Sequence, residues 1–303
     1  MELNHKGLKE DQLLTEGKEQ KRKLIKFFEK RGYNNLRSFG EHSVNFIFIG
    51  EKEGKEYFIK KYNRPVSAAE DINVRRTNTE IACYKNLPKD MLIDFIEADA
   101  KENYIILKKV ELEDIEKNEK AVKELIDFAL TKFSKIDASF LKQYTWEDYE
   151  NLFKKFERIE KAGAIEDAKE VKRMFIDKKE LIEKAPKVFS HLDYNFLNVK
   201  KLNGKIVPFD FENSLNDNPM VDMSVLYIEI CDNDKLLQKF KEEISCYKLY
   251  NEDLLKLMII RRCAIVANAG LGPNGELRYQ MPFRKKNIDL LRKLVKGGEL
   301  YPD

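Results

Sequence analysis

The sequence is poor in the residues that build metal centres and disulfide frameworks. Its 303 residues include three histidines and four cysteines, and no two cysteines form a Cys-x-x-Cys pair. A histidine-rich metal site, a zinc site and a disulfide framework are therefore not expected. Since no cysteine pattern indicates an oxidising compartment, a reduced, cytoplasmic setting is the simplest interpretation.

The chain also lacks long apolar runs and a large charge of one sign. No run is long enough to span a bilayer and the first residues do not form a secretory signal pattern, so no membrane association is expected. The 56 basic and 53 acidic residues leave a formal net charge of +3, which does not indicate nucleic-acid binding. What is present, 43% hydrophobic and 36% charged residues, is typical of a globular chain with a sizeable core.

Strand patterns gather in the first third of the chain. A charged tail at residues 1–20 and a helical pattern at residues 21–31 come first. Alternating apolar residues and turn residues then predict strands within four segments, at residues 37–50, 57–62, 91–98 and 104–110, with a helix around residues 79–84. Together these elements predict a lobe over residues 21–110 with a five-stranded antiparallel sheet and a helix.

The remainder, residues 111–303, is predicted to be mainly helical. Helical spacing of apolar residues is found from Val122 to Phe133, and further helical patterns cover residues 165–182, 236–250, 254–268 and 284–295. Strands first and helices later predict an α+β, bilobal fold with the functional site between the lobes. Aromatic residues from Tyr144 to Phe156 are compatible with core packing or with a cation-binding pocket, and core packing is the more common use.

The stretch at residues 188–210 carries the side chains best suited to chemistry. An apolar run leads to His191 and Asp193, Asn198 follows, and a second apolar run ends in Asp210. A tight turn between the two runs predicts a small hairpin that brings two carboxylates and a carboxamide together. Phosphoryl transfer uses such a set, with one Asp for the hydroxyl proton and an Asn and an Asp for Mg²⁺. Taken singly, these are also common loop residues.

The order His191-x-Asp193-x4-Asn198, with Asp210 at the end of a hydrophobic strand, resembles the catalytic loop of the protein-kinase-like fold. The detail is similar to its small-molecule branch, the aminoglycoside phosphotransferase and choline/ethanolamine kinase family. Protein kinases have Arg after the His and Asp-Phe-Gly at the metal site, whereas this chain has Leu192 and Asp210-Phe211-Glu212. The small-molecule kinases carry a further Asp after an Asp-Pro-like turn.

That further Asp is matched by Asp222 at the end of Asn218-Pro219-Met220-Val221-Asp222. The chain departs from the family at two places. Leu192 stands where the family usually has Gly, and Phe196-Leu197 stands where it usually has Pro-Gly.

The resemblance implies roles for the residues of this stretch. Asp193 would accept or orient the proton of the acceptor hydroxyl. Asn198 and Asp210 would bind Mg²⁺ against the nucleotide phosphates, and His191 and Asp222 would brace the loop by hydrogen bonds.

It also implies a nucleotide site in the first lobe. Lys60, at the end of an apolar strand, would contact the phosphates of ATP, and Glu80 on the following helix would orient it. Its neighbour Lys61 is the alternative, because alternation turns the two lysines to opposite faces of the sheet. The turn at Gly40 would cover the phosphates, and adenine would lie against backbone between Lys108 and Glu111, which includes Val110.

The function implied is ATP-dependent, Mg²⁺-dependent phosphorylation of a hydroxyl on a small molecule. Choline, an aminoglycoside, a sugar and an amino alcohol all remain open as acceptors, and the oligomeric state is not indicated. Acidic residues that follow Asp222 would face the amines of a cationic acceptor or form a solvated helix edge balanced by lysines: Glu229, Asp232, Asp234, Glu242 and Glu243. The altered loop at Leu192 and Phe196-Leu197 favours an alternative, a catalytically weak or inactive kinase-like binding or structural protein such as a spore-coat-associated relative.

Overall fold

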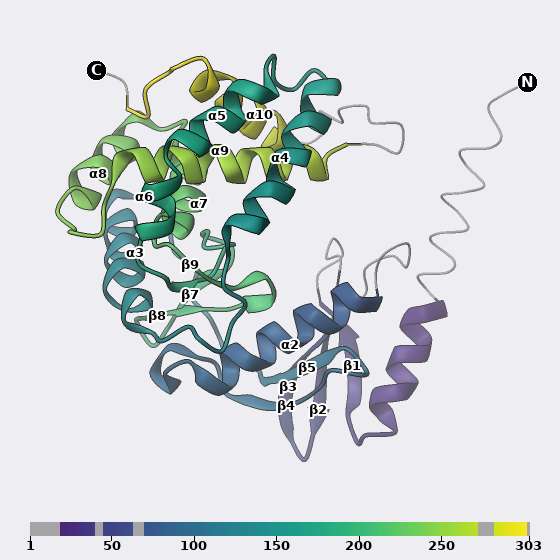
Figure 1. Ribbon diagram of the computed structural model, residues 1–303. Helices are drawn as coiled ribbons and strands as arrows, with labels where there is room; N and C mark the ends of the chain where they lie inside the picture. The colour runs from purple at the N-terminus through teal and green to yellow at the C-terminus, as the bar shows by residue number, and fades with distance from the viewer. Residues whose placement is uncertain (1–18, 40–44, 63–69, 272–281, 302–303) are drawn as a thin grey trace, which may run out of the picture. The chain divides into compact units, whose positions relative to one another are not determined.

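The computed structural model of the protein describes residues 19–39, 45–62, 70–271 and 282–301 (Figure 1). The chain divides into two compact units, Met1–Glu111 and Leu112–Asp303. Residues 1–18 of the predicted tail and the predicted phosphate-loop residue Gly40 lie outside the described residues.

The first unit is built on a five-stranded antiparallel sheet, as predicted, and its strand order is β1-β2-β3-β5-β4. Its strands are β1 (Asn34–Ser38), β2 (Phe46–Lys52), β3 (Lys55–Lys61), β4 (Phe95–Asp99) and β5 (Tyr104–Lys108). Two strand bounds differ from those expected. Strand β1 was missed because four of its five residues are exposed, so it has no apolar alternation. The segment that begins at Met91 starts as a short 3-10 helix (Lys89–Met91) after Pro88, not as a strand.

Helices cover both faces of this sheet. Helical residues 19–29 place Phe28 against Phe48 and Tyr104, in a core that also contains Ile59. Because side chains alternate along β3, Lys60 points to the opposite face. There it meets α2 (Glu70–Asn86), which runs along the sheet in Figure 1.

The second unit is mainly helical. Its helices are α3 (Glu119–Thr131), α4 (Trp146–Lys161), α5 (Ala168–Asp177), α6 (Lys179–Lys184), α7 (Met220–Ile230), α8 (Asp234–Ile244), α9 (Glu252–Ala269) and α10 (Pro282–Val295). Helix α9 contacts α4, α7 and α10 and is apolar around most of its circumference, so it forms the centre of this unit (Figure 1). The single helix expected over residues 165–182 is two helices that meet at Lys178, and the helix expected to reach Tyr250 ends at Ile244.

Two short strand pairs carry the candidate catalytic stretch. Strand β7 (Val199–Leu202) pairs with β8 (Lys205–Pro208), which confirms the predicted hairpin. Its turn has φ 52° at Asn203 and 74° at Gly204, the positive values that two-residue hairpin turns require. Strand β6 (Val188–Ser190) pairs antiparallel with β9 (Leu215–Asp217). In the described residues, no helix has the length and apolar character needed to cross a bilayer.

Candidate active site

In the first unit, Lys60 is held by a buried carboxylate. Its Nζ lies 2.8 Å from Oε2 of Glu80, whose side chain is 1% exposed. The ion pair expected from the resemblance is therefore present, between the end of β3 and the middle of α2. The hydroxyl of Tyr62 donates to the same oxygen, and Lys60 Nζ lies 4.7 Å from the Tyr62 ring centroid. Tyr62 was not predicted, although its spacing of two from Lys60 places it on the same face of the strand.

Lys61 has different surroundings. Its Nζ donates to the main-chain carbonyl of Glu102, and burial lowers the pKa of its ammonium group. Of the two neighbouring lysines, Lys60 therefore forms the ion pair with Glu80. This is the strand register that was preferred from the sequence.

The predicted adenine-binding backbone lies at the end of β5. The N–H of Lys108 donates to the Asp94 carbonyl at 2.9 Å, so it is already used within the unit. The Lys108 side chain is exposed and pairs with Asp94. Val110 follows the strand, and within residues 70–271 its N–H has no main-chain partner. Of the two, Val110 is therefore the better candidate for a backbone contact with a base.

In the second unit, the carboxylate of Asp193 is fixed at both oxygens. Arg262 on α9 donates from Nη2 to Oδ1 at 2.5 Å, and Asn213 donates from Nδ2 to Oδ2 at 2.6 Å. Burial opposes ionisation of Asp193, but the attraction of the Arg262 guanidinium outweighs it and lowers the pKa of the carboxyl. Asp193 is therefore ionised at neutral pH. Neither partner was predicted, because Arg262 is distant in sequence and Asn213 follows the metal-site motif without belonging to it.

The backbone around Asp193 is braced by His191 and Asp222. The His191 ring has Nε2 at 2.9 Å from the Phe209 carbonyl and Nδ1 at 3.3 Å from the Asp193 N–H. These contacts assign the proton to Nε2. Burial lowers the pKa of His191, which keeps the ring neutral. The Asp222 carboxyl accepts from the main-chain N–H groups of His191 at 2.9 Å and Leu192 at 2.8 Å.

Leu192 keeps the backbone conformation for which the resembling family uses glycine. Its φ is 66°, in the left-handed region, where an L-residue with a side chain is less stable by roughly 1–2 kcal/mol. The hydrogen bonds that the N–H groups of residues 191 and 192 donate to the Asp222 carboxyl hold the turn in this conformation.

The candidate metal ligands follow the same loop. Asn198 donates its side-chain Nδ2 to the Asp193 carbonyl at 3.0 Å, which leaves Oδ1 as the atom that can bind a cation. The Phe209 N–H donates to the Asn198 carbonyl at 3.0 Å and so brings Asp210 next to Asn198. Carboxylate oxygens of Asp210 and Glu212 lie within 4.8 Å of each other. An Asn oxygen and two nearby carboxylates fit the oxygen ligands that Mg²⁺ prefers, and Glu212 was not predicted as a ligand.

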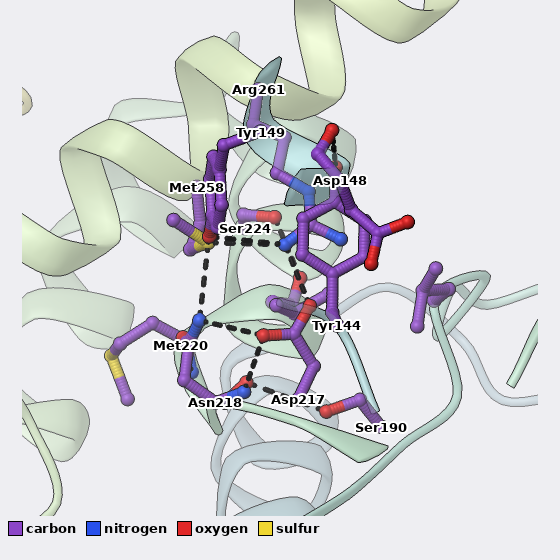
Figure 2. A network of polar contacts seen from close by, with 12 residues as sticks. Tyr144, Asp148, Tyr149, Ser190, Asp217, Asn218, Met220, Ser224, Met258 and Arg261 are labelled. Carbon is purple, nitrogen blue, oxygen red and sulfur yellow. Dashed lines mark hydrogen bonds and ion pairs between the residues drawn. The ribbon is translucent and has the colours of Figure 1, made fainter. Parts of the chain in front are cut away.

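A buried ion pair lies beside this loop (Figure 2). Arg261 Nη1 on α9 is 2.6 Å from Oδ2 of Asp217 at the end of β9, and both side chains are almost fully buried. Asp217 also accepts from the main-chain N–H of Asn218 at 2.7 Å. The guanidinium carbon of Arg261 lies 3.7 Å from the Tyr144 ring centroid, so an internal arginine occupies the face of this aromatic residue. Tyr149 is buried as well, and core packing is the better interpretation of this aromatic segment.

Three of the five acidic residues that follow Asp222 are paired with lysines. Distances between their charged atoms are 2.8 Å for Glu229 and Lys117, 2.9 Å for Asp232 and Lys286, and 2.9 Å for Glu243 and Lys123. Such pairing is what a solvated, charge-balanced helix edge is expected to show, and it gives no support to an acidic pocket.

Solved structures that this chain resembles include small-molecule kinases. Choline kinase LicA from Streptococcus pneumoniae has a TM-score of 0.62 at 13% sequence identity, with 92% of this chain and 98% of that chain covered. Aminoglycoside phosphotransferase APH(4)-Ia has a TM-score of 0.63 at 13% identity, with 91% and 98% covered. ADP-bound aminoglycoside phosphotransferase APH(2'')-Ib has a TM-score of 0.60 at 13% identity, with 90% and 98% covered.

By sequence, no protein-family model and no curated protein matches the chain. The structural likeness therefore establishes the fold: the chain has the α+β, kinase-like fold of these enzymes, which confirms the fold predicted from the sequence.

Proposed function

We propose that the protein is an ATP-dependent phosphotransferase that acts on an alcohol hydroxyl of a small molecule. The observation that carries the proposal is the ionised Asp193 carboxylate, fixed by Arg262 and Asn213 in a loop that also contains Asn198 and leads to Asp210. The fold supports it, because structural neighbours include kinases solved with ADP and with AMP-PNP, in ternary complexes that also contain hygromycin B.

In the proposed reaction, the oxygen of the acceptor hydroxyl attacks the γ-phosphorus of ATP, and Asp193 accepts the proton of that hydroxyl. The bond between that phosphorus and the bridging oxygen of ADP breaks, so the products are the phosphate ester, ADP and a proton that leaves from Asp193. Mg²⁺ held by Asn198, Asp210 and Glu212 would neutralise charge on the phosphates. Lys60, oriented by Glu80 and Tyr62, would contact the phosphates as a cation.

The alternative of an inactive kinase-like binding protein rested on the departures from the family loop. Leu192 keeps the left-handed backbone, and Phe196 is buried within the unit while Leu197 is 75% exposed. Neither departure displaces Asp193 from its two hydrogen-bond partners. The proposal of an active enzyme is therefore preferred.

The test is an ATP-consumption screen over a library of small alcohols with wild type and Asp193→Asn. We expect turnover with at least one acceptor, and we expect Asp193→Asn to reduce kcat by about 10²–10⁴-fold while ATP still binds, because the variant removes the proton acceptor. Asp114→Asn is the matched control, since Asp114 is 88% exposed and pairs with Lys200 at the surface. Turnover in Asp193→Asn equal to that of the wild type would contradict the assignment.

A further inference from the structure

Asp193 shares its immediate surroundings with a fixed positive charge. A hydroxyl that donates to Asp193 at the usual distance of about 2.7 Å must approach an oxygen of the same carboxylate that Arg262 contacts at 2.5 Å. The acceptor therefore binds within a few ångströms of a guanidinium. Arg262 and Asp193 are 23% and 22% exposed at their side chains, so both are reachable by a small molecule.

Arg262 has hydrogen-bonding capacity beyond this contact. A guanidinium has five N–H donors in a planar fork that matches carboxylates and phosphates. Within the described residues, the hydrogen bond that Arg262 makes is the one to Asp193. Its other donors are therefore suited to an anionic group carried by the acceptor.

Among the described residues, no acidic side chain lines the pocket next to Arg262. Its lining combines the apolar side chains of Leu192, Val225 and Met258 with Arg261 and Arg262, and no carboxylate takes part in it. Arg261 is neutralised by Asp217, and Asp193 is neutralised by Arg262. An ammonium group placed here would meet two guanidinium groups, and the carboxylates nearest to it, those of Asp193 and Asp217, are each already paired with one of them.

Several features of this unit that could bind a cationic ligand already contact a lysine or an arginine. The carboxylates of Glu229 and Asp232 pair with lysines. One face of the Tyr144 ring contacts Arg261, and one face of the Trp146 ring contacts Lys179, whose Nζ lies 4.7 Å from the ring centroid.

We propose that the acceptor is an alcohol that carries an acidic group, a carboxylate or a phosphate, and that Arg262 binds this group beside the reacting hydroxyl. The inference rests on the proposed phosphotransferase function and replaces the cationic acceptor suggested by the acidic residues of the sequence. Arg262 then has two roles: it positions Asp193 and selects the charge of the acceptor.

The test compares alcohols that share a carbon skeleton and differ in charge. One set is glycerate, glycerol and aminopropanediol, and the other is gluconate, glucose and glucosamine, each added to the screening library. For the wild type we expect kcat/KM to be at least about tenfold higher for the acid than for the amine, which corresponds to about 1.4 kcal/mol. The preference should decline as ionic strength rises, because added salt screens the attraction.

Variants at Arg262 separate charge selection from a general loss of activity. Arg262→Met should lower kcat/KM for every acceptor, because Asp193 loses its partner, and should also remove the acid-to-amine preference. Arg262→Lys retains the charge and should restore part of that preference. Lys123→Met, at an exposed lysine paired with Glu243, is the control and should leave the preference unchanged.

The outcomes distinguish the two proposals. Preference for the amine, or equal use of acid and amine, overturns the acidic acceptor while the phosphotransferase function stands. An acid preference that survives in Arg262→Met also overturns it, because Arg262 would then not be the selecting residue. No turnover with any alcohol of the library overturns the proposed function and this inference with it.

Discussion

At the residue scale, Lys60 and Lys61 are adjacent lysines with opposite surroundings. Lys60 pairs with the buried carboxylate of Glu80, and Lys61 donates to the Glu102 carbonyl. If Lys60 contacts the phosphates of ATP, Lys60→Ala should raise the KM for ATP by about tenfold or more, the effect of losing a charge-assisted contact worth about 1.5–3 kcal/mol. Lys61→Ala should change it by less than about threefold.

Steady-state kinetics on both variants checks this prediction, with thermal unfolding as a control for damage to the fold. Lys60→Met is a useful third variant because it keeps the aliphatic stem and removes only the charge. If Lys61→Ala proves the more harmful substitution, the face of β3 that meets the nucleotide is the other one.

Asp222 is a residue whose charge depends on pH in an accessible range. Burial raises the pKa of its carboxyl to about 7, although the N–H groups of His191 and Leu192 oppose the shift. In the unfolded chain an Asp titrates near a pKa of about 3.9. Between these two pKa values the folded state binds a proton that the unfolded state releases. The contribution of Asp222 to the free energy of unfolding is therefore largest below about pH 4 and is lost as the pH rises through about 7.

We expect the free energy of unfolding to show this contribution as a difference between wild type and Asp222→Asn. Relative to the variant, the wild type should lose stability with rising pH by at most about 1.4 kcal/mol per pH unit, the limit for one proton. His191 acts in the opposite direction below its unfolded pKa of about 6.5, because its folded pKa is lowered by burial. Both proteins contain His191, so urea titrations from pH 4 to 8 isolate Asp222, and parallel pH curves would contradict the shift.

What the sequence predicts at this scale depends on whether a residue belongs to a contiguous pattern. Asp193, Asn198 and Asp210 lie within one stretch and are recognisable by spacing, and Lys60 by its place at the end of a strand. The partners of Asp193 come from elsewhere: Arg262 lies on α9 and reaches the loop only through the packing of the unit. No periodicity or spacing could assign that contact.

At the element scale, a buried ion pair between Arg261 and Asp217 links α9 to β9. The desolvation of two charges makes such a pair a weak source of net stability, but removing one partner leaves a buried charge unpaired, at a cost of about 3–5 kcal/mol. We therefore expect Arg261→Met to lower the free energy of unfolding by about that amount. The double variant Arg261→Met/Asp217→Leu should lose less than the sum of the two single variants.

Urea unfolding of the three variants measures this coupling. Lys184→Ala is the control, because Lys184 pairs with Glu180 on the surface, where both side chains are more than 70% exposed: 74% and 79%. A surface pair of this kind contributes about 0–1 kcal/mol. Additive losses in the double variant would show that the pair is not coupled.

Elements differ in how well pattern alone defines them. Helix α3 was recognised from its apolar face, and its start is fixed by Asn118, whose side chain accepts from the Ala121 N–H at 3.0 Å. Strand β1 was missed because exposed residues give no alternation. The break at Lys178 between α5 and α6 was missed because neither Gly nor Pro marks it.

At the scale of the whole molecule, the order of strands and helices along the chain predicted the α+β class, and the kinase-like fold was predicted from the resemblance carried by residues 191–210. The five strands of the large sheet come first and most of the helices follow, which is the pattern of an α+β protein. The identity of the acceptor is a different kind of information. It depends on which charges surround Asp193 after helices distant in sequence have packed. Glu229 and Asp232, two of the acidic residues that suggested a cation, are paired with lysines in the folded chain.

A whole-molecule measurement also tests the proposed metal site. A ligand that binds the folded protein stabilises it by RT ln(1 + [L]/Kd), about 2.7 kcal/mol at a hundredfold excess over Kd. Mg²⁺ with ATP should therefore raise the Tm of the wild type. Asp210→Ala should lose most of the Mg²⁺-dependent part of this rise, because phosphates and water alone do not replace a charged ligand.

Glu212→Gln should lose a smaller part of that rise. The Glu212 carboxylate lies within 4.8 Å of the Asp210 carboxylate, and the variant removes the first and keeps the second. Asp114→Ala is the control for the removal of an exposed carboxylate and should keep the full rise. Each protein is measured with ATP alone, with Mg²⁺ alone and with both, so that metal-independent nucleotide binding is subtracted. A Mg²⁺-dependent rise in Asp210→Ala as large as that of the wild type would mean that Asp210 does not bind the metal.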